Sequence, residues 1–239
     1  MATNTVVGTI PVGTYPVGIG MMPNGAFAYV VNGGSNNVSV IRTATRAVAA
    51  TIPVGSIGTA AGINSAAKVT PNGAFVYVTN YLANEVSVIA TATNTVVATV
   101  PVGSSASGVA ITPNGAHACV AGRDGTISVI ATATNTVVAT VSGLAYPAEV
   151  AITPDGSYAY VTTAADGAVA VVATATNTVV ATVPVESWPI GMAITPNGAY
   201  AYVANQFSNS VSVIATASNT VVDTVPVGSW PAWGVYGKV

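Results

Sequence analysis

Short apolar runs separated by turn residues recur along the whole chain. The runs are rich in Val, Ile, Tyr and Thr, a composition that predicts β-strands. One copy of the pattern occupies residues 191–228 and contains four runs, at residues 191–195, 199–204, 210–215 and 220–227. We call them runs A, B, C and D. Because the links from A to B and from C to D are short, neighbouring strands are predicted to be antiparallel.

The tripeptide P-[ND]-G links run A to run B in every copy. In this turn Pro presets φ and Gly supplies a left-handed position, which predicts a tight hairpin. The first step between copies is lengthened by an Ala-rich and Gly-rich insertion between Ser56 and Ala67. The tripeptide begins at Pro23, Pro71, Pro113, Pro154 and Pro196. A period of about 42 residues predicts an array of repeated structural units.

A four-stranded unit that is apolar on both faces must bury both faces against its neighbours. Stacked around an axis, such units form a β-propeller. We therefore predict an all-β fold, with residues 1–239 as a single β-propeller domain of five complete four-stranded antiparallel blades. Run D occurs once more at the N-terminus and run A once more at residues 234–239. These spare strands could close the ring, form a partial sixth blade, or associate with another molecule, since an unpaired edge is a hazard.

Run B carries two columns of aromatic residues, which we expect to form the core between blades. One column contains Phe27, Phe75, Tyr158 and Tyr200, and the other contains Tyr29, Tyr77, Tyr160 and Tyr202.

A family resemblance is carried by run B of the second copy, which reads Tyr77-Val78-Thr79-Asn80 and is followed by SVIATATNTVVATVPVG. This resembles the YVTN family of β-propeller repeats, and the resemblance covers essentially the whole chain. It implies a surface-layer or other cell-surface protein. Similar repeats also occur in propellers resembling lactonases and in subunits of redox enzymes, so the resemblance is specific for fold and weak for function. Family members usually have more blades than five.

The low charge and high hydrophobic content of the chain bear on whether it binds nucleic acid or spans a membrane. Only 5% of residues are charged, 51% are hydrophobic and the formal net charge is -2. Nucleic-acid binding is not expected, because it needs a basic stripe that the chain lacks. Pro, Gly and Asn interrupt the apolar segments before the roughly 18 residues that a spanning helix needs, so no membrane span is expected. No signal peptide precedes the first repeat. We expect a trimmed form or fragment of a longer extracellular or cell-surface array.

Cysteine and histidine offer little for metal or covalent chemistry. Cys119 is the only cysteine, so an intrachain disulfide is excluded. In other copies, aromatic residues occupy the positions of His117 and Cys119, which predicts a place in the core for both. One His and one Cys cannot supply the three or four ligands of a zinc site. Neither a phosphate-binding glycine loop nor a serine nucleophile elbow is found. We therefore expect no metal and no cofactor.

The links from B to C and from D to A differ in every copy, whereas the other two barely change. Variation on one rim is typical of a scaffold that presents loops. Aromatic residues precede proline on this rim at Tyr15, Tyr146, Trp188 and Trp230. Their rings would surround the mouth of the central channel, as in binding patches rich in Trp and Tyr. Alternatively, they cap the core between blades.

Charged residues interrupt a column of small residues in run A, which we expect to line the channel. These residues are Lys68 and Glu149. They could bind a polar ligand, act as an acid and base, or form a structural pair in a wet channel. The other charges are expected to be solvated in the variable loops, at Glu85, Arg123, Asp124, Asp166 and Glu186.

The function expected from these patterns is a non-enzymatic cell-surface or secreted scaffold that binds a protein or glycan through its aromatic loop face. The expected ligand-binding residues are Tyr15, Tyr146, Trp188, Trp230, Lys68 and Glu149. No catalytic residue is expected, because catalysis needs convergent titratable groups and the chain has few. The alternative is a lactonase-like or lyase-like propeller enzyme with Lys68, Glu149 and Asp166 at the mouth of the channel.

Overall fold

The structure, a computed structural model, describes residues 5–59 and 65–232. Its strands form five four-stranded antiparallel sheets, and the strands of each sheet follow one another in chain order. The prediction of an all-β propeller with five complete four-stranded blades is confirmed.

The blades take their strands in order along the chain. Blade 1 contains β1 (Pro16–Met21), β2 (Phe27–Asn32), β3 (Asn37–Arg42) and β4 (Ala47–Pro53). Blade 2 contains β5 (Ala67–Val69), β6 (Phe75–Asn80), β7 (Glu85–Ala90) and β8 (Thr95–Pro101). Blade 3 contains β9 (Ala106–Ile111), β10 (His117–Gly122), β11 (Thr126–Ala131) and β12 (Thr136–Val141). Blade 4 contains β13 (Pro147–Ile152), β14 (Tyr158–Thr163), β15 (Ala168–Ala173) and β16 (Thr178–Pro184). Blade 5 contains β17 (Pro189–Ile194), β18 (Tyr200–Asn205), β19 (Ser210–Ala215) and β20 (Thr220–Pro226).

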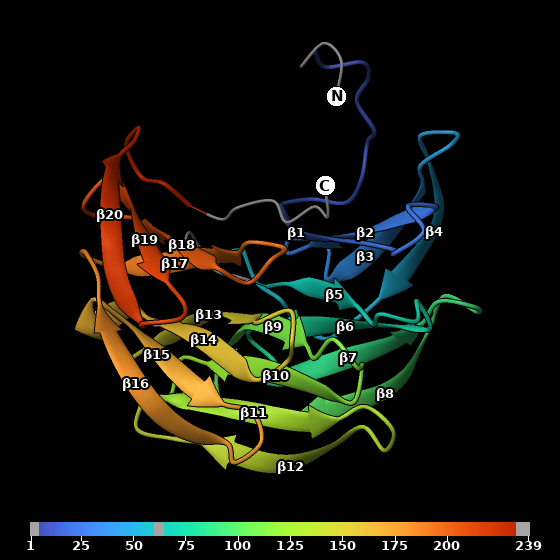
Figure 1. The fold of residues 1–239 in the computed structure, drawn as a ribbon. Helices are drawn as coiled ribbons and strands as arrows, with labels where there is room; N and C mark the ends of the chain where they lie inside the picture. The colour runs from blue at the N-terminus through green and yellow to red at the C-terminus, as the bar shows by residue number, and fades with distance from the viewer. Residues whose placement is uncertain (1–4, 60–64, 233–239) are drawn as a thin grey trace.

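The blades follow one another around an arc, and the first strand of each blade is innermost (Figure 1). The strands β1, β5, β9, β13 and β17 therefore line the centre, and the fourth strand of each blade lies at the periphery. Blades 1 and 5 lie on either side of the opening at the top of Figure 1. Side chains on the innermost strands are thus the ones that reach the centre.

The hairpin turns have the chemistry that their residues predict. Gly73 has a φ of 73°, in the left-handed region that the turn after Pro71 requires. The Asn72 side-chain oxygen accepts the Thr70 hydroxyl at 2.7 Å and the Ala74 N–H at 3.0 Å. These bonds close the hairpin on the rim opposite the variable loops.

A tyrosine at the centre of the second strand joins neighbouring blades. Tyr77 is fully buried, and its hydroxyl donates to the side-chain oxygen of Asn135, in a turn of blade 3, at 2.7 Å. Burial raises the pKa of the Tyr77 hydroxyl to about 12. The same bond joins Tyr29 to Asn94 and Tyr160 to Asn219. In blades 1, 2 and 4 this aromatic column is core between blades, as expected, whereas its member in blade 5, Tyr202, is exposed, contrary to the expectation.

The other aromatic column is not core throughout, and that part of the expectation is wrong. Tyr158 and Tyr200, at the turn end of the second strand, are 41% and 42% exposed, whereas Phe27 and Phe75 at the same position are half-buried.

Blades 1 and 5 lie at the two ends of the arc, and each has an exposed face that no other described blade covers. Tyr202 of blade 5 is 44% exposed, although Tyr77 at the equivalent position is fully buried. Val225 is likewise 42% exposed, against 3% for Val100. At the other end, Ile19 of blade 1 is 50% exposed.

Among residues 5–12, the described part of the N-terminal spare run, none belongs to a strand. Ile10 and Val12 pack beside the core residues Ala28, Val30 and Ile41 of blade 1. The C-terminal spare run, at residues 234–239, lies outside the described residues.

Candidate functional site

Glu149 is a buried carboxyl group on the innermost strand of blade 4. It is only 4% exposed. Its backbone N–H donates to the Thr162 hydroxyl at 2.9 Å, and its Oε1 accepts the Val150 N–H at 3.2 Å. Burial raises the pKa of the Glu149 carboxyl to about 7, although the Lys68 charge and the Val150 N–H each oppose that rise. Near neutral pH this carboxyl can therefore both accept and release a proton.

Lys68 lies on the innermost strand of blade 2 and lines a cavity of about 190 Å³. The other residues around this cavity have apolar side chains and come from the innermost strands of blades 3 to 5: Ala110, Ile111, Val150, Ala151, Ile152, Met192, Ala193 and Ile194. The Lys68 charge lowers the pKa of Glu149. The two charged residues that interrupt the small-residue column therefore act on one another across blade 3.

Gly108, on the strand between them, makes room for Glu149. A Cβ at Gly108 would lie 2.7 Å from Cα of Glu149, 2.8 Å from the Ala148 carbonyl oxygen and 3.0 Å from Oε1 of Glu149. The carboxyl group thus lies over a position where no side chain fits.

Replacing Gly108 with Ala is expected to destabilise the fold by about 1 to 3 kcal/mol, because the new methyl group would overlap backbone atoms of blade 4. The measurement is the free energy of unfolding in denaturant. Gly228→Ala is the control, since a Cβ at Gly228 would meet nothing within 4 Å. Equal stability of the Gly108 and Gly228 variants would contradict the close approach of blades 3 and 4.

An aromatic cluster lies on the variable rim near Glu149. Tyr146 and Trp188 have ring centroids 5.6 Å apart, Trp188 stacks on Phe207 at 5.2 Å, and Phe207 meets Trp230 edge-on at 5.6 Å. Three of the four rim aromatics are thus joined, through a phenylalanine that the repeat pattern does not predict. The fourth, Tyr15, lies in blade 1 and is 66% exposed.

Arg123 extends this cluster and is not the solvated loop charge that the sequence suggests. Its guanidinium carbon lies 4.7 Å from the Tyr146 ring centroid and 5.1 Å from the Tyr81 ring centroid. Its Nη1 donates to both hydroxyls, at 2.8 Å to Tyr146 and 3.2 Å to Tyr81. One cation between two rings therefore links the rim loops of blades 2, 3 and 4.

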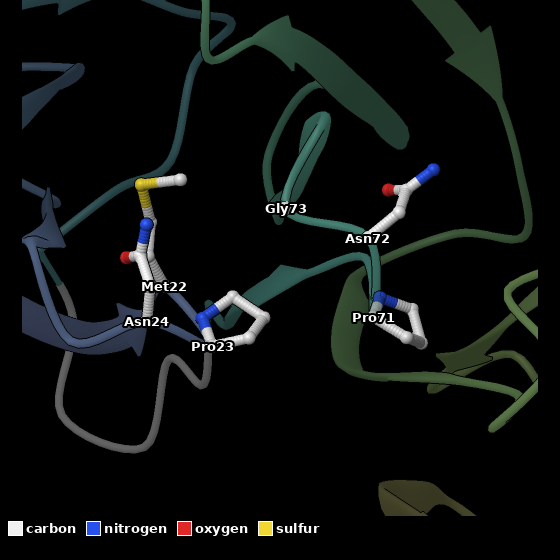
Figure 2. Close-up of a pocket in the computed structure, with 6 residues that line it drawn as sticks. All are labelled: Met22, Pro23, Asn24, Pro71, Asn72 and Gly73. Atoms are coloured by element: carbon white, nitrogen blue, oxygen red, sulfur yellow. The ribbon is translucent and has the colours of Figure 1, made fainter.

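A second cavity, of about 80 Å³, lies between the hairpin turns of blades 1 and 2 on the opposite rim. Figure 2 shows Met22, Pro23, Asn24, Pro71 and Asn72 around it. The side-chain oxygen of Asn24 accepts the Ala26 N–H, as that of Asn72 does in its own turn. Both asparagines thus serve their hairpins, and the cavity is small for a ligand site.

The remaining sequence candidates do not join the channel site. Asp166 is exposed at the end of the 3-10 helix Ala164–Asp166. Cys119 is buried in the core, and burial raises the pKa of its thiol to about 12, which disfavours the reactive thiolate. Within residues 5–59 and 65–232, no three His, Cys, Asp or Glu side chains are placed to hold a metal ion. In the same ranges, no helix is long and apolar enough to cross a membrane.

Comparison with protein families matches residues 11–139 and 122–222 to a family described as lactonase, 7-bladed beta-propeller. The chain belongs to this lactonase family. The described residues of this lactonase-family chain form five blades. No curated protein matches it.

Solved structures resemble the lactonase-family chain in fold. Hydrazine synthase from Kuenenia stuttgartiensis is 21% identical, with a TM-score of 0.68 over 96% of this chain and 92% of that chain. A functionally unknown protein from Desulfotomaculum acetoxidans DSM 771 is 19% identical, with a TM-score of 0.74 over 90% of this chain and 74% of that chain. At such identities the likeness concerns the fold alone.

The expectation of a non-enzymatic scaffold that binds a protein or glycan is wrong, because the family match favours the enzymatic alternative. That expectation relied on the scarcity of titratable residues, yet one buried carboxyl under the influence of one lysine charge is enough for acid and base chemistry. Several expectations stay predictions: the single domain over residues 1–239, the cell-surface location, self-association through the spare strands, and ligand binding by the rim aromatics.

Proposed function

We propose that this protein is an enzyme that hydrolyses a lactone in the central channel, with Glu149 as general base and Lys68 as the cation that stabilises the oxyanion. The observation that carries this proposal is the Glu149 carboxyl, whose pKa is raised to about 7 by burial against the lowering effect of the Lys68 charge. The family match supplies the reaction class. We also propose that the repeats are of the YVTN type, because residues Tyr77 to Asn80 read Tyr-Val-Thr-Asn.

The proposed reaction needs only water and the two side chains. Ionised Glu149 takes a proton from water as the water oxygen attacks the lactone carbonyl carbon, and Lys68 stabilises the negative charge on the carbonyl oxygen. The bond from that carbon to the ring oxygen then breaks. The ring oxygen leaves as an alcohol with the proton that Glu149 returns, and the product is a hydroxy acid. Base and acid roles both suit a carboxyl whose pKa is near 7.

The size and lining of the cavity favour a small lactone. Pockets for drug-sized ligands usually enclose about 300 Å³ or more, whereas the cavity beside Lys68 has about 190 Å³. Among its side chains, the Lys68 ammonium is the polar group. We propose that the substrate enters the channel from the aromatic rim, because Tyr146 of that rim is three residues before Glu149 in the sequence.

The test is lactone hydrolysis by the full chain, followed as acid release from δ-valerolactone and from glucono-δ-lactone. Wild type is expected to act faster on δ-valerolactone, with a rate that rises with pH through about 7 as Glu149 ionises. Glu149→Gln is expected to lower kcat at least about 100-fold, the lower range for loss of a general base. Lys68→Met removes a charge that lowers the pKa of Glu149, so the pH profile should move to higher pH.

Two controls make the assay decisive. Asp166→Asn and Glu186→Gln remove exposed rim carboxylates and should leave the rate unchanged. The proposal fails if wild type does not exceed the uncatalysed rate, or if Glu149→Gln is as active as wild type.

A further inference from the structure

The innermost strands of blades 1, 3, 4 and 5 each contain a β-bulge, in which two residues face one residue of the second strand. In blade 4, Pro147 pairs with Thr163 and Val150 pairs with Val161, so Ala148 and Glu149 both face Thr162. Register shifts occur at the same place in blades 1, 3 and 5. Bulges re-aim side chains and are frequent beside active sites. Glu149 thus occupies the second bulge position, whose side chain lies on the channel wall.

The blades fall into two groups according to the second-strand residue at the level of Thr162. In blades 1, 3 and 5 it is Val31, Ala121 and Ala204, and in blades 2 and 4 it is Thr79 and Thr162. The Thr162 hydroxyl accepts the Glu149 N–H at 2.9 Å, and the Thr79 hydroxyl accepts the Ala66 N–H at 2.8 Å. Both threonines are fully buried. A threonine hydroxyl therefore accepts the N–H at this level of the innermost strand in the two blades that carry Glu149 and Lys68.

The residue at the position of Glu149 in each blade differs between the same two groups of blades. It is Gly18, Gly108 and Gly191 in the blades without threonine, and Ala66 and Glu149 in the blades with it. A Cβ at Gly18 would collide with the Ser65 carbonyl oxygen of blade 2, and a Cβ at Gly108 would collide with Cα of Glu149. The position therefore faces the next innermost strand closely. A side chain occurs there only in the two blades where a threonine hydroxyl accepts the N–H of that residue.

We propose that Thr162 is a positioning residue for Glu149, which holds the bulge so that the carboxyl group stays buried over Gly108. Without the hydroxyl, the buried Glu149 N–H loses its acceptor, and an unsatisfied buried donor is unfavourable. The strand would relax to give this N–H access to water, and the adjacent carboxyl would be exposed with it. The catalytic consequence rests on the proposed function, whereas the effect on the ionisation of Glu149 does not.

The experiment measures the pKa of Glu149 by carbon NMR of its side-chain carboxyl, in the full chain without substrate. Thr162→Val and Thr162→Ala are expected to lower the pKa by about one unit or more, because desolvation is the main cause that raises it. Both replacements occur naturally at this position in other blades, as Val31 and Ala121, so folding is expected. Thr162→Ser keeps the hydroxyl and should retain the wild-type pKa.

The control is Thr79→Val, which removes the hydroxyl that accepts the Ala66 N–H and donates to the Ser107 carbonyl. It alters the strand of Lys68, whose charge lowers the pKa of Glu149, so it should not lower that pKa. The proposal is overturned if Thr162→Val and Thr162→Ala keep the wild-type pKa, or if Thr79→Val lowers it equally. If lactones are not hydrolysed but the Thr162 variants shift the pKa, the proposed function fails and the positioning role stands.

In the hydrolysis assay, Thr162→Val should lower kcat with little change in KM, because Thr162 acts through Glu149 and does not touch substrate. Thr162→Ser should restore kcat. A change in KM alone would contradict the positioning role.

Discussion

Replacing Glu149 with Gln is expected to raise the free energy of unfolding by about 3 kcal/mol at alkaline pH and to change it little at acidic pH. The folded-state pKa of Glu149 is raised from 4.5 to about 7. Below the unfolded-state value the carboxyl is protonated in both states and costs nothing. As pH rises through about 7, the folded protein must hold a buried charge that the unfolded chain holds in water, so stability falls. Glutamine has no charge to bury at any pH.

The measurement is urea unfolding of wild type and variant at about pH 4 and about pH 9, on either side of the titration. The informative quantity is the change in the stability difference between the two pH values, because it cancels effects of the amide itself. Glu186→Gln removes an exposed carboxylate and provides the control. A stability difference that does not depend on pH would show that Glu149 is not desolvated, and the proposed base would lose its support.

The burial of the Glu149 carboxyl explains both the expected loss of stability at alkaline pH and the proposed chemistry. A carboxyl in contact with water would be more stable when ionised, but it would be a weak base at neutral pH. The bulge opposite Thr162 and the missing side chain at Gly108 keep Glu149 out of water. Because active sites often retain such destabilising features, the pH dependence of stability is itself a sign of function.

The fold was predictable because each repeat carries its own turns. The P-[ND]-G tripeptide and alternating apolar runs locate four strands per copy, and the structure shifts only their ends. Strand β17 begins at Pro189, before the predicted residue 191, because Pro189 pairs with Asn205 across the bulge. No pattern of single residues predicts the bulge, since its two residues differ between blades: Val17-Gly18, Ser107-Gly108, Ala148-Glu149 and Ile190-Gly191.

The site was predictable only in part. Lys68 and Glu149 were found because they interrupt a column of small residues. Phe207 and Arg123 lie in loops that differ in every copy, so comparison among repeats provides no column in which to recognise them. Thr162 had a signal that was overlooked: it shares its column with Thr79, whereas the other copies have Val or Ala there.

Tyr77→Ala is expected to destabilise the protein by about 3 to 5 kcal/mol, the range for truncation of a fully buried aromatic side chain. Tyr77 packs among Val109, Ala118 and Ile130 of the next blade, so its loss leaves a cavity within the blade 2 and blade 3 interface. Tyr77→Phe keeps the ring and removes only the hydrogen bond to Asn135, which should cost about 1 kcal/mol. Free energies of unfolding in urea test both values.

Tyr202→Ala is the matched control, because the same residue at the same repeat position is 44% exposed in blade 5. Its truncation should cost about 1 kcal/mol, as for most substitutions outside a packed core. The difference between the stability losses of Tyr77→Ala and Tyr202→Ala therefore measures how much packing against a neighbouring blade adds to the stabilisation by a tyrosine of this column. Equal losses for Tyr77→Ala and Tyr202→Ala would mean that the outer face of blade 5 is covered in solution, contrary to its exposure in this structure.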